Sequence, residues 1–497
     1  MIKGLILITF LSIYTFCISQ SKVEDGFLID KQVIESDLFT FIDTSINQIE
    51  WYSSKAVSGF FNSLINIDSQ KVTILHIGDS HLQFDKGAGT TRELFGSVFN
   101  LSGRGMIYPY ATAQTHATYD YKTKAEGDWL YSKNTQSNPL TPLSISGITS
   151  STADPNATFS FTILEKTSAF KSSNIIRVFH KNCDSSFNIR CHFSASKTKN
   201  KFGAKKINTD TITDEILVTS FQIPILLNEI NFSFKAVDST QKYFELYGVS
   251  LESNNDKGLI YHSVGINGAD ISSFLKEDLF AQHISIVKPE LIILDLGTND
   301  LLSKDDDLKI IENKYQNAID KIKNACPNSC ILMPSVQDFY YKGRNVKKAK
   351  DFTKIQKLIA KKNDISFYNY YNVSGGQYSM RKWRSNDLSS SDKIHLNRKG
   401  YKLKGELLYH AIINSYIKFS EGSIDSNIVK MPVKVEEKKI TTNNMSNNSQ
   451  FKTYKIRSGD SLHVIAKRNN TSVYELKKIN NLKSNMIIIG NYIKIPN

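Results

Sequence analysis

The chain has 497 residues, of which 40% are hydrophobic. This length excludes a single domain of average size and predicts two to four domains with a sizeable core. The formal net charge of +14 favours contact with polyanions, although charge alone identifies no partner.

The first residues of the chain predict a secretory signal peptide. Lys3 precedes an apolar stretch of roughly a dozen residues, which small or polar residues follow. The stretch is too short for a membrane span, and we expect a signal peptide over residues 1–19 with cleavage near Ser19. Cys17 leaves a lipoprotein anchor open. Because no later apolar run could cross a bilayer, we expect a secreted or periplasmic, envelope-associated protein whose partners are envelope polymers rather than nucleic acid.

Export would place the chain in an oxidising compartment. There, Cys183 with Cys191 and Cys326 with Cys330 could each close a short loop, although free buried thiols fit the sequence as well. The spacing of Cys326 and Cys330 is metal-like, but no second Cys or His pair lies near enough to complete a zinc site. We therefore predict no metal.

After a mainly helical pattern over residues 23–70, an apolar, β-branched run at Val72–Ile77 leads into Gly78-Asp79-Ser80. A parallel strand covered on both faces has this composition, and ligands of open α/β sheets bind beyond the carboxyl ends of such strands. Ser80 is therefore a candidate nucleophile, with Gly78 allowing a sharp turn before it. The same tripeptide is also typical of turns and helix caps.

Residues 110–255 are dominated by Ser, Thr and Asn and have a β-rich pattern. Short alternating stretches separated by turn residues predict strands at Ala157–Leu164, Ile175–His180, Glu215–Ile223 and Glu229–Phe234. We interpret this block as a domain inserted after the first strand of an α/β domain, with or without a binding role.

From residue 256 to 419, short apolar strands alternate with helical patterns. The expected strands are Leu259–Val264, Leu291–Leu296, Cys330–Pro334 and Ile365–Tyr368. The expected helices are Ile271–Val287, Asp306–Asn324, Val346–Lys362 and Asn397–Phe419. This alternation predicts an α/β fold with a doubly wound parallel sheet, in a discontinuous domain of residues 20–109 and 256–419.

The C-terminal part of the chain consists of two segments that differ in composition. Residues 420–452 lack apolar periodicity and are rich in Asn, Ser, Thr, Lys and Glu, which predicts a disordered linker. Residues 453–497 regain a pattern of strand, two helices and closing strand, which predicts a small α+β module.

Nucleophilic catalysis by Ser80 would need a base, a group that orients the base, and donors for the oxyanion. Asp392 and His395 lie in a loop before the last helix, and their spacing can place the carboxylate beside Nδ1 and leave Nε2 facing Ser80. Gly268 and Asn299 follow the next two strands, so the backbone N–H of Gly268 and the amide of Asn299 are candidate oxyanion donors. Taken singly, each motif is also typical of an ordinary loop.

In this order, the segments Gly78-Asp79-Ser80, Gly268, Gly297-Thr298-Asn299-Asp300 and Asp392-Lys393-Ile394-His395 resemble the SGNH/GDSL hydrolase superfamily. The resemblance implies a flavodoxin-like sheet, Ser80 as nucleophile, His395 as general base and then acid, and Asp392 as its orienter. It implies an oxyanion hole from the N–H groups of Ser80 and Gly268 with the Asn299 amide, and no cofactor. Asp79 and Asp300 would shape turns.

In two further features the chain resembles the branch that includes peptidoglycan O-acetylesterases. His81 directly follows Ser80, and the β-rich block follows the strand that leads into Ser80. In that branch the inserted domain is a carbohydrate-binding-like jelly roll. The segment before Asp392 is also similar, and it makes Trp383 a candidate lip of the sugar site, although an aromatic residue there can equally belong to the core.

The C-terminal module, residues 453–497, resembles a LysM domain, a module that binds N-acetylglucosamine-containing glycans such as peptidoglycan. By family position, its groove would lie between a loop containing Gly459, Asp460 and Ser461 and a second loop near residues 483–487.

Together, these features predict an exported serine esterase that removes acetyl groups from a cell-wall glycan, with O-acetylated peptidoglycan as the expected substrate and LysM as the anchor. Two alternatives stay open: a glycan O-acetyltransferase that uses the same acyl-enzyme, and a catalytically inert wall-binding protein. The glycan, the oligomeric state and any role of the insertion in binding are not determined by the sequence.

Overall fold

The computed structural model forms two compact units, residues 1–433 and 434–497, which are described separately. In the first unit it describes residues 39–194, 202–224, 228–303 and 307–420. In the second it describes 451–456, 465–466, 468–469, 471, 473–480 and 492–496. The predicted signal peptide with Cys17, residues 421–450 of the predicted linker, and Gly459, Asp460 and Ser461 lie outside the described residues.

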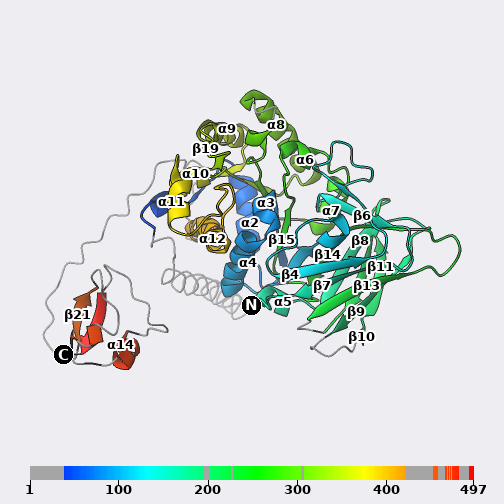
Figure 1. The fold of residues 1–497 in the computed structure, drawn as a ribbon, viewed down its shortest axis with the longest axis horizontal. Coiled ribbons are helices and arrows are strands. Elements are labelled where there is room, and N and C mark those ends of the chain that lie inside the picture. Colours follow the sequence, from blue (N-terminus) through cyan, green and yellow to red (C-terminus); the bar gives the residue numbers. More distant parts are fainter. Residues whose placement is uncertain are drawn as a thin grey trace, which may run out of the picture. The chain divides into compact units, whose positions relative to one another are not determined.

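The first unit is built on a six-stranded sheet of order β1-β20-β17-β16-β2-β15 (Figure 1). Its strands are β1 (Ile49–Glu50), β2 (Lys71–Gly78), β15 (Gly258–Gly265), β16 (Leu291–Asp295), β17 (Cys330–Pro334) and β20 (Ser366–Tyr368). Five strands are parallel, and β1 is antiparallel to β20. In chain order the parallel strands are arranged 2-1-3-4-5, which confirms the predicted flavodoxin-like, doubly wound sheet.

Helices cover both faces of this sheet (Figure 1). One group comprises α2 (Ser54–Ile65), α4 (Lys86–Val98) and α12 (Arg398–Ser420). The other comprises α6 (Ile271–Leu275), α7 (Phe280–Val287), α8 (Leu308–Ala325) and α9 (Lys348–Lys362). Shorter elements are η2 (Thr44–Ile46), α3 (Ser80–Gln83), η4 (Asp300–Leu302), β18 (Tyr340–Tyr341), β19 (Arg344–Asn345), α10 (Tyr370–Val373) and α11 (Ser379–Ser385).

Two expected helices differ from the structure. In the described part of residues 23–70, only α2 is an α-helix, because Ile49–Glu50 pairs with β20 as an edge strand. The helix expected at Ile271–Val287 is broken into α6 and α7. At the break, the ammonium of Lys321 donates to the carbonyls of Phe274, Leu275 and Glu277, at 3.4, 3.1 and 2.8 Å.

The insertion forms two antiparallel sheets. The first has the order β11-β12-β8-β14-β6-β5, with β3 beside β14. Its strands are β3 (Gly103–Ile107), β5 (Leu130–Lys133), β6 (Ile148–Thr152), β8 (Ile175–Lys181), β11 (Lys205–Thr211), β12 (Ile216–Gln222) and β14 (Phe244–Glu252). The second has the order β10-β9-β13-β7-β4. Its strands are β4 (Tyr121–Glu126), β7 (Thr158–Ile163), β9 (Asn188–Ser194), β10 (Phe202–Gly203) and β13 (Glu229–Lys235). The short helices η3 (Tyr110–Ala113) and α5 (Ser168–Lys171) lie between these strands in the sequence.

Aromatic side chains pack between the two sheets of the insertion. The rings of Phe234 and Phe244 lie 4.7 Å apart, and those of Phe221 and Phe232 lie 6.5 Å apart. On its other face the larger sheet contacts the α/β domain, where Phe179 lies 4.4 Å from His283 of α7. The buried side chains of both domains therefore form one continuous core. The larger sheet includes β3, which precedes the expected start of the insertion at residue 110.

The four cysteines considered for disulfides, Cys183, Cys191, Cys326 and Cys330, are free thiols. Cys191 and Cys330 are buried, and burial raises the pKa of the Cys326 thiol to about 11 and that of Cys330 to about 12. These two thiols are therefore protonated at neutral pH.

In the second unit, β21 (Phe451–Lys455) pairs antiparallel with β22 (Tyr492–Pro496), and α14 (Val473–Ile479) lies between them in the sequence. The unit has a small core of its own, formed by Ile456, Ile465, Ala466, Leu476, Ile493 and Ile495. Across the described parts of both units, no helix is both long and apolar enough to cross a membrane.

Candidate active site

Ser80 begins α3 directly after the central strand β2. A Cβ on Gly78 would lie 2.9 Å from the carbonyl oxygen of Asp295, so only glycine fits at the strand end. Asp79 caps the short helix because its Oδ1 accepts a hydrogen bond from the N–H of His81 at 2.9 Å. The strand end therefore presents the hydroxyl of Ser80 at the edge of the sheet.

The structure brings His395 and Asp392 into line with Ser80. Oγ of Ser80 lies 2.8 Å from Nε2 of His395, and Nδ1 of His395 lies 2.7 Å from Oδ2 of Asp392. The other oxygen of Asp392 accepts hydrogen bonds from the N–H groups of Ile394 and His395, at 2.9 and 3.0 Å. Burial opposes ionisation of Asp392, but the hydrogen bonds from His395 and the backbone outweigh it and lower the pKa of its carboxyl.

The two strands that flank β2 carry the predicted oxyanion donors. Gly268, which follows β15, has φ +81°, in the left-handed region that glycine tolerates. The amide nitrogen of Asn299, which follows β16, donates to the carbonyl of Ala269 at 2.9 Å and lies 3.4 Å from Oδ2 of Asp79. Asp300 accepts a hydrogen bond from the N–H of Ile271 at 3.1 Å, which ties the two loops together.

The carboxyls of Asp79 and Asp300 are buried beside these donors. Burial and the neighbouring Asp295 raise the pKa of Asp79 to about 7. Burial and Asp270 raise the pKa of Asp300 to about 7 as well. Both side chains accept hydrogen bonds from backbone N–H groups in the first turns of short helices, α3 and α6.

His81 contacts the candidate base directly. The sequence indicated only that His81 is typical of one branch of the superfamily. Its ring lies 5.1 Å from the ring of His395 at an interplanar angle of 35°. Its Nδ1 lies 3.1 Å from the hydroxyl of Tyr401. Desolvation and the nearby Lys404 and His395 lower the pKa of His81 well below its usual value, so its imidazole is neutral. Its position directly after Ser80 on α3 was the available signal.

Gln83, at the end of α3, joins the site to the insertion. Its side-chain oxygen accepts a hydrogen bond from the N–H of Asn267, next to Gly268, at 2.6 Å. Its amide nitrogen donates to the carbonyl of His116 at 2.7 Å, in the loop after η3. The inserted segment is therefore fastened to the oxyanion loop, a contact that the sequence analysis missed because the residues are far apart in the chain.

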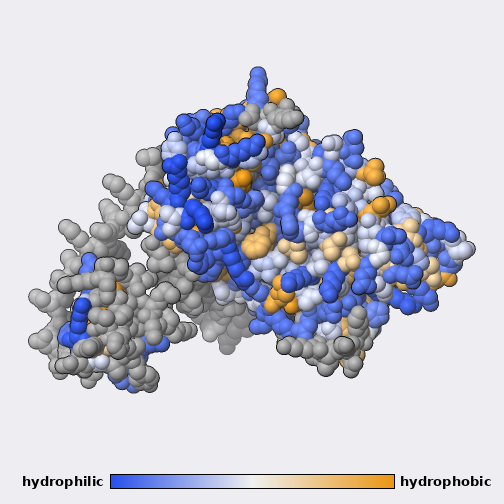
Figure 2. All heavy atoms as spheres, viewed as in Figure 1, coloured by the Kyte–Doolittle hydropathy of each residue, from blue (hydrophilic) through white to orange (hydrophobic). Residues whose placement is uncertain are grey.

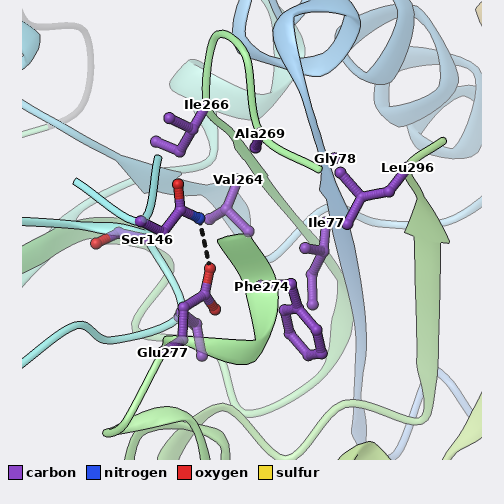
Figure 3. Close-up of a pocket in the computed structure, with 11 residues that line it drawn as sticks. Ile77, Gly78, Ser146, Val264, Ile266, Ala269, Phe274, Glu277 and Leu296 are labelled. Atoms are coloured by element: carbon purple, nitrogen blue, oxygen red, sulfur yellow. Dashed lines mark hydrogen bonds between the residues drawn. The ribbon is translucent and has the colours of Figure 1, made fainter. Parts of the chain in front are cut away.

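A small cavity lies behind the strand ends, lined by Ile77, Gly78, Val264, Ile266 and Leu296 together with Glu277 (Figure 3). Glu277 Oε1 accepts a hydrogen bond from the amide of Asn134, a residue of the insertion, at 2.9 Å. The cavity therefore sits where the insertion meets the α/β domain.

The prediction that Trp383 forms the lip of a sugar site is wrong. Its side chain is 0% exposed, its ring packs edge-on against Phe41 at 6.1 Å, and its Nε1 donates to the carbonyl of Ser374 at 2.8 Å. A side chain with no exposed surface and a satisfied N–H belongs to the core.

The Ser80 site is open to solvent. The side chains of His395 and Asp392 are 37% and 44% exposed, and Ser80 is half-buried. The reacting groups therefore lie at the surface, where a bulky polymer can reach them. Among the described residues, no group of three or more His, Cys, Asp or Glu side chains is arranged to hold a metal ion.

Comparison with known protein families identifies the two units. Residues 237–403 match the GDSL-like lipase/acylhydrolase family, and residues 454–496 match the LysM domain. The chain thus contains a GDSL-like acylhydrolase domain and a LysM domain, and its α/β domain is that of a hydrolase of ester bonds. The family match includes Gly268, Asn299, Asp392 and His395 but begins after Ser80, which the insertion separates from them.

Among solved structures, the chain is similar to a peptidoglycan O-acetylesterase, with 18% identity and a TM-score of 0.58 over 75% of this chain and 99% of that one. This likeness shows a shared SGNH hydrolase fold. An acetylxylan esterase from Geobacillus stearothermophilus matches with 14% identity and a TM-score of 0.25, over 31% of this chain and 72% of that one. A family two carbohydrate esterase from Clostridium thermocellum matches with 10% identity and a TM-score of 0.27, over 60% of this chain and 100% of that one. No curated protein sequence matches the chain.

Proposed function

We propose that the protein is an exported serine esterase that hydrolyses O-acetyl esters of a cell-wall glycan, with peptidoglycan as the substrate and the LysM domain as the anchor. The observation that carries the proposal is the hydrogen-bonded line from Ser80 through His395 to Asp392 at the carboxyl end of the central strand. The similarity to a peptidoglycan O-acetylesterase supports the choice of substrate.

In the proposed mechanism, Ser80 Oγ attacks the carbonyl carbon of the acetyl ester while Nε2 of His395 takes its proton. Asp392 holds the imidazole by its Nδ1 and stabilises the imidazolium that forms. The N–H groups of Ser80 and Gly268 donate to the oxyanion, and the amide of Asn299 joins them by giving up its longer contact, the one with Asp79. His395 then protonates the departing sugar oxygen, and a water molecule, deprotonated by His395, releases acetate from the acetylated Ser80.

The exposure of the catalytic side chains suits an ester carried on a large substrate. With His395 and Asp392 more than one-third exposed, the ester can approach while the rest of the polymer stays outside. LysM modules bind N-acetylglucosamine-containing glycans, so the same polymer would be held by the second unit.

Substitution of Ser80 tests the nucleophile. Ser80→Ala is expected to abolish acetate release from O-acetylated peptidoglycan, because the acyl-enzyme cannot form. Asn299→Ala is expected to lower kcat by a factor of about 100 to 1,000, which is the usual effect of losing one oxyanion donor. Free acetate is measured against time, and unchanged acetate release by Ser80→Ala would refute the assignment.

A second measurement separates hydrolysis from acetyl transfer. The protein is incubated with O-acetylated peptidoglycan and a chito-oligosaccharide acceptor, and free acetate and acetylated acceptor are both quantified. The proposal predicts mainly free acetate. Accumulation of acetylated acceptor would identify an O-acetyltransferase, and the absence of both products would favour a wall-binding protein.

A further inference from the structure

The catalytic loop carries a cation that forms part of a cluster around a tyrosine ring. Tyr340, the first residue of β18, lies between Arg381 of α11 and Lys393, the residue that follows Asp392. The guanidinium carbon of Arg381 is 5.3 Å from the ring centroid, and Nζ of Lys393 is 5.7 Å from it. These distances are typical of cation–π contacts, so the ring fixes both cations.

This cluster is joined to the catalytic residues by the backbone. The N–H of Tyr340 donates to the carbonyl of Lys393 at 2.9 Å. Lys393 itself has φ +57° and forms the turn between Asp392 and His395. The ring of Tyr340 therefore holds both cations beside the loop that carries Asp392 and His395.

The segments around the cluster are strongly basic. Residues 340–350 and 379–386 contain eight Lys or Arg and no Asp or Glu. Asp338, which lies next to both segments, is fully buried, and its oxygens accept hydrogen bonds from Asn345 and Met380 at 2.7 and 3.0 Å.

Two other cations near the loop are paired. Arg398 contacts Glu165, and Lys399 contacts Asp387 at 2.5 Å. Figure 2 shows strongly hydrophilic side chains gathered over α11. Within the described part of the chain, neither Arg381 nor Lys393 forms an ion pair with a carboxylate, so both cations are available to an anionic ligand.

We propose that Arg381 and Lys393 bind an anionic group of the substrate, a carboxylate or a phosphate, that the glycan carries near the acetylated hydroxyl. The inference rests on the proposed function and narrows its substrate class to acetylated polyanionic glycans. A guanidinium holds an anionic oxygen pair in fork geometry, and an ammonium adds a second charge. On a polymer with regularly repeated anions, one anion would lie near this patch whenever an acetyl ester reaches Ser80.

The test compares Arg381→Gln with Lys382→Gln, its exposed neighbour on α11, on the full-length protein. The substrates are O-acetylated peptidoglycan, the same material with its carboxylates amidated, and neutral acetylated xylan. Arg381→Gln is expected to raise KM for untreated peptidoglycan about fivefold, the size expected for one exposed ionic contact, and to leave kcat unchanged. Lys382→Gln is expected to change neither parameter.

Amidation distinguishes a carboxylate from a phosphate as the bound group. If the bound group is a carboxylate, amidation raises the wild-type KM and removes the difference between Arg381→Gln and wild type. If the bound group is a phosphate, the difference survives amidation. In both cases, added salt weakens binding by the wild type more than binding by Arg381→Gln. Salt screens the charge of Arg381, which the variant no longer has. Arg381→Lys, which keeps the charge but loses the fork geometry, is expected to restore part of the lost affinity.

The proposal is overturned if Arg381→Gln and Lys382→Gln have equal effects, or if Arg381→Gln loses as much activity on acetylated xylan as on peptidoglycan, which would indicate a structural role. It is also overturned if Arg381→Lys behaves like Arg381→Gln. A wild-type enzyme that releases acetate from xylan but not from peptidoglycan would instead refute the proposed function, so the two failures are distinguishable.

Discussion

His81 lies against the candidate base, with its Nδ1 held by the hydroxyl of Tyr401. A neutral ring in this position limits the rotation of His395 without placing a second charge beside it. The groups that face His81 are His395, Tyr401, Lys404, Asp295 and Asp392. We therefore expect His81 to be a positioning residue, acting on Ser80 only through His395.

A double-mutant cycle tests this role. His81→Phe keeps a flat ring beside His395 but loses the bond to Tyr401, and Tyr401→Phe removes the same bond from the other side. Each variant is expected to lower kcat on a small acetyl ester by a factor on the order of ten, because a small displacement of the base slows proton transfer. The double variant should be no slower than either single one.

Two other outcomes of the cycle carry information. Additive losses of kcat would show that the two residues act independently and would contradict the positioning role. An equal change of KM would point to substrate contact instead. A purely structural defect would lower the melting temperature without moving the pH profile of kcat, whereas a displaced base should move it.

At the same scale, Trp383 shows where sequence reasoning on a single residue fails. Its neighbours Arg381, Lys382 and Arg384 are exposed, so the local composition is that of a surface segment. Only the direction of one side chain on the short helix α11 decides between core and surface. That direction is set by the acceptor at Ser374 and the ring of Phe41, which the sequence does not place.

At the scale of elements, Glu277 lies in the break between α6 and α7. Its buried carboxyl packs against the insertion, where it accepts a hydrogen bond from Asn134. Burial is the main cause that raises the pKa of Glu277 above the usual value of 4.5, while Lys321 and the amide of Asn134 oppose the shift. The folded state therefore holds this proton more tightly than the unfolded chain. The stability that follows is fully present below the unfolded pKa and is lost as pH rises through the folded pKa.

Glu277→Gln is expected to remove this pH dependence, because the amide stays neutral and its oxygen can still accept from Asn134. Relative to wild type, the variant should gain about 2 °C or more in melting temperature at pH 9 and little at pH 5. Thermal unfolding at the two pH values measures the difference. Glu312→Gln, at a half-buried position of α8, serves as the control, and an equal response of the two variants would contradict the assignment.

At the scale of the whole molecule, the catalytic domain and the LysM domain have separate hydrophobic cores. Their chemistry is also separate, because every residue of the proposed catalytic line lies in the first unit. Tethering raises the local concentration of substrate without changing the reacting groups.

Deletion of residues 453–497 is therefore expected to weaken binding to insoluble peptidoglycan at least tenfold, since a tethered module commonly contributes that much or more. Hydrolysis of a small soluble acetyl ester should stay within about twofold of the full chain. Pull-down with insoluble wall and a soluble ester assay measure the two effects. A parallel loss of both would contradict the modular interpretation.

The sequence by itself determined the parallel sheet, the β-rich insertion, the C-terminal module and the identities of Ser80, Asn299, Asp392 and His395 as candidates. These follow from local signals, namely apolar runs, turn residues and short motifs at strand ends. The tertiary structure decided which of them meet: the 2.8 Å contact of Ser80 with His395 joins residues 315 positions apart. It also decided the contact of His81 with His395, the burial of Trp383 and the cations around Tyr340, because side-chain direction and long-range packing depend on the whole fold.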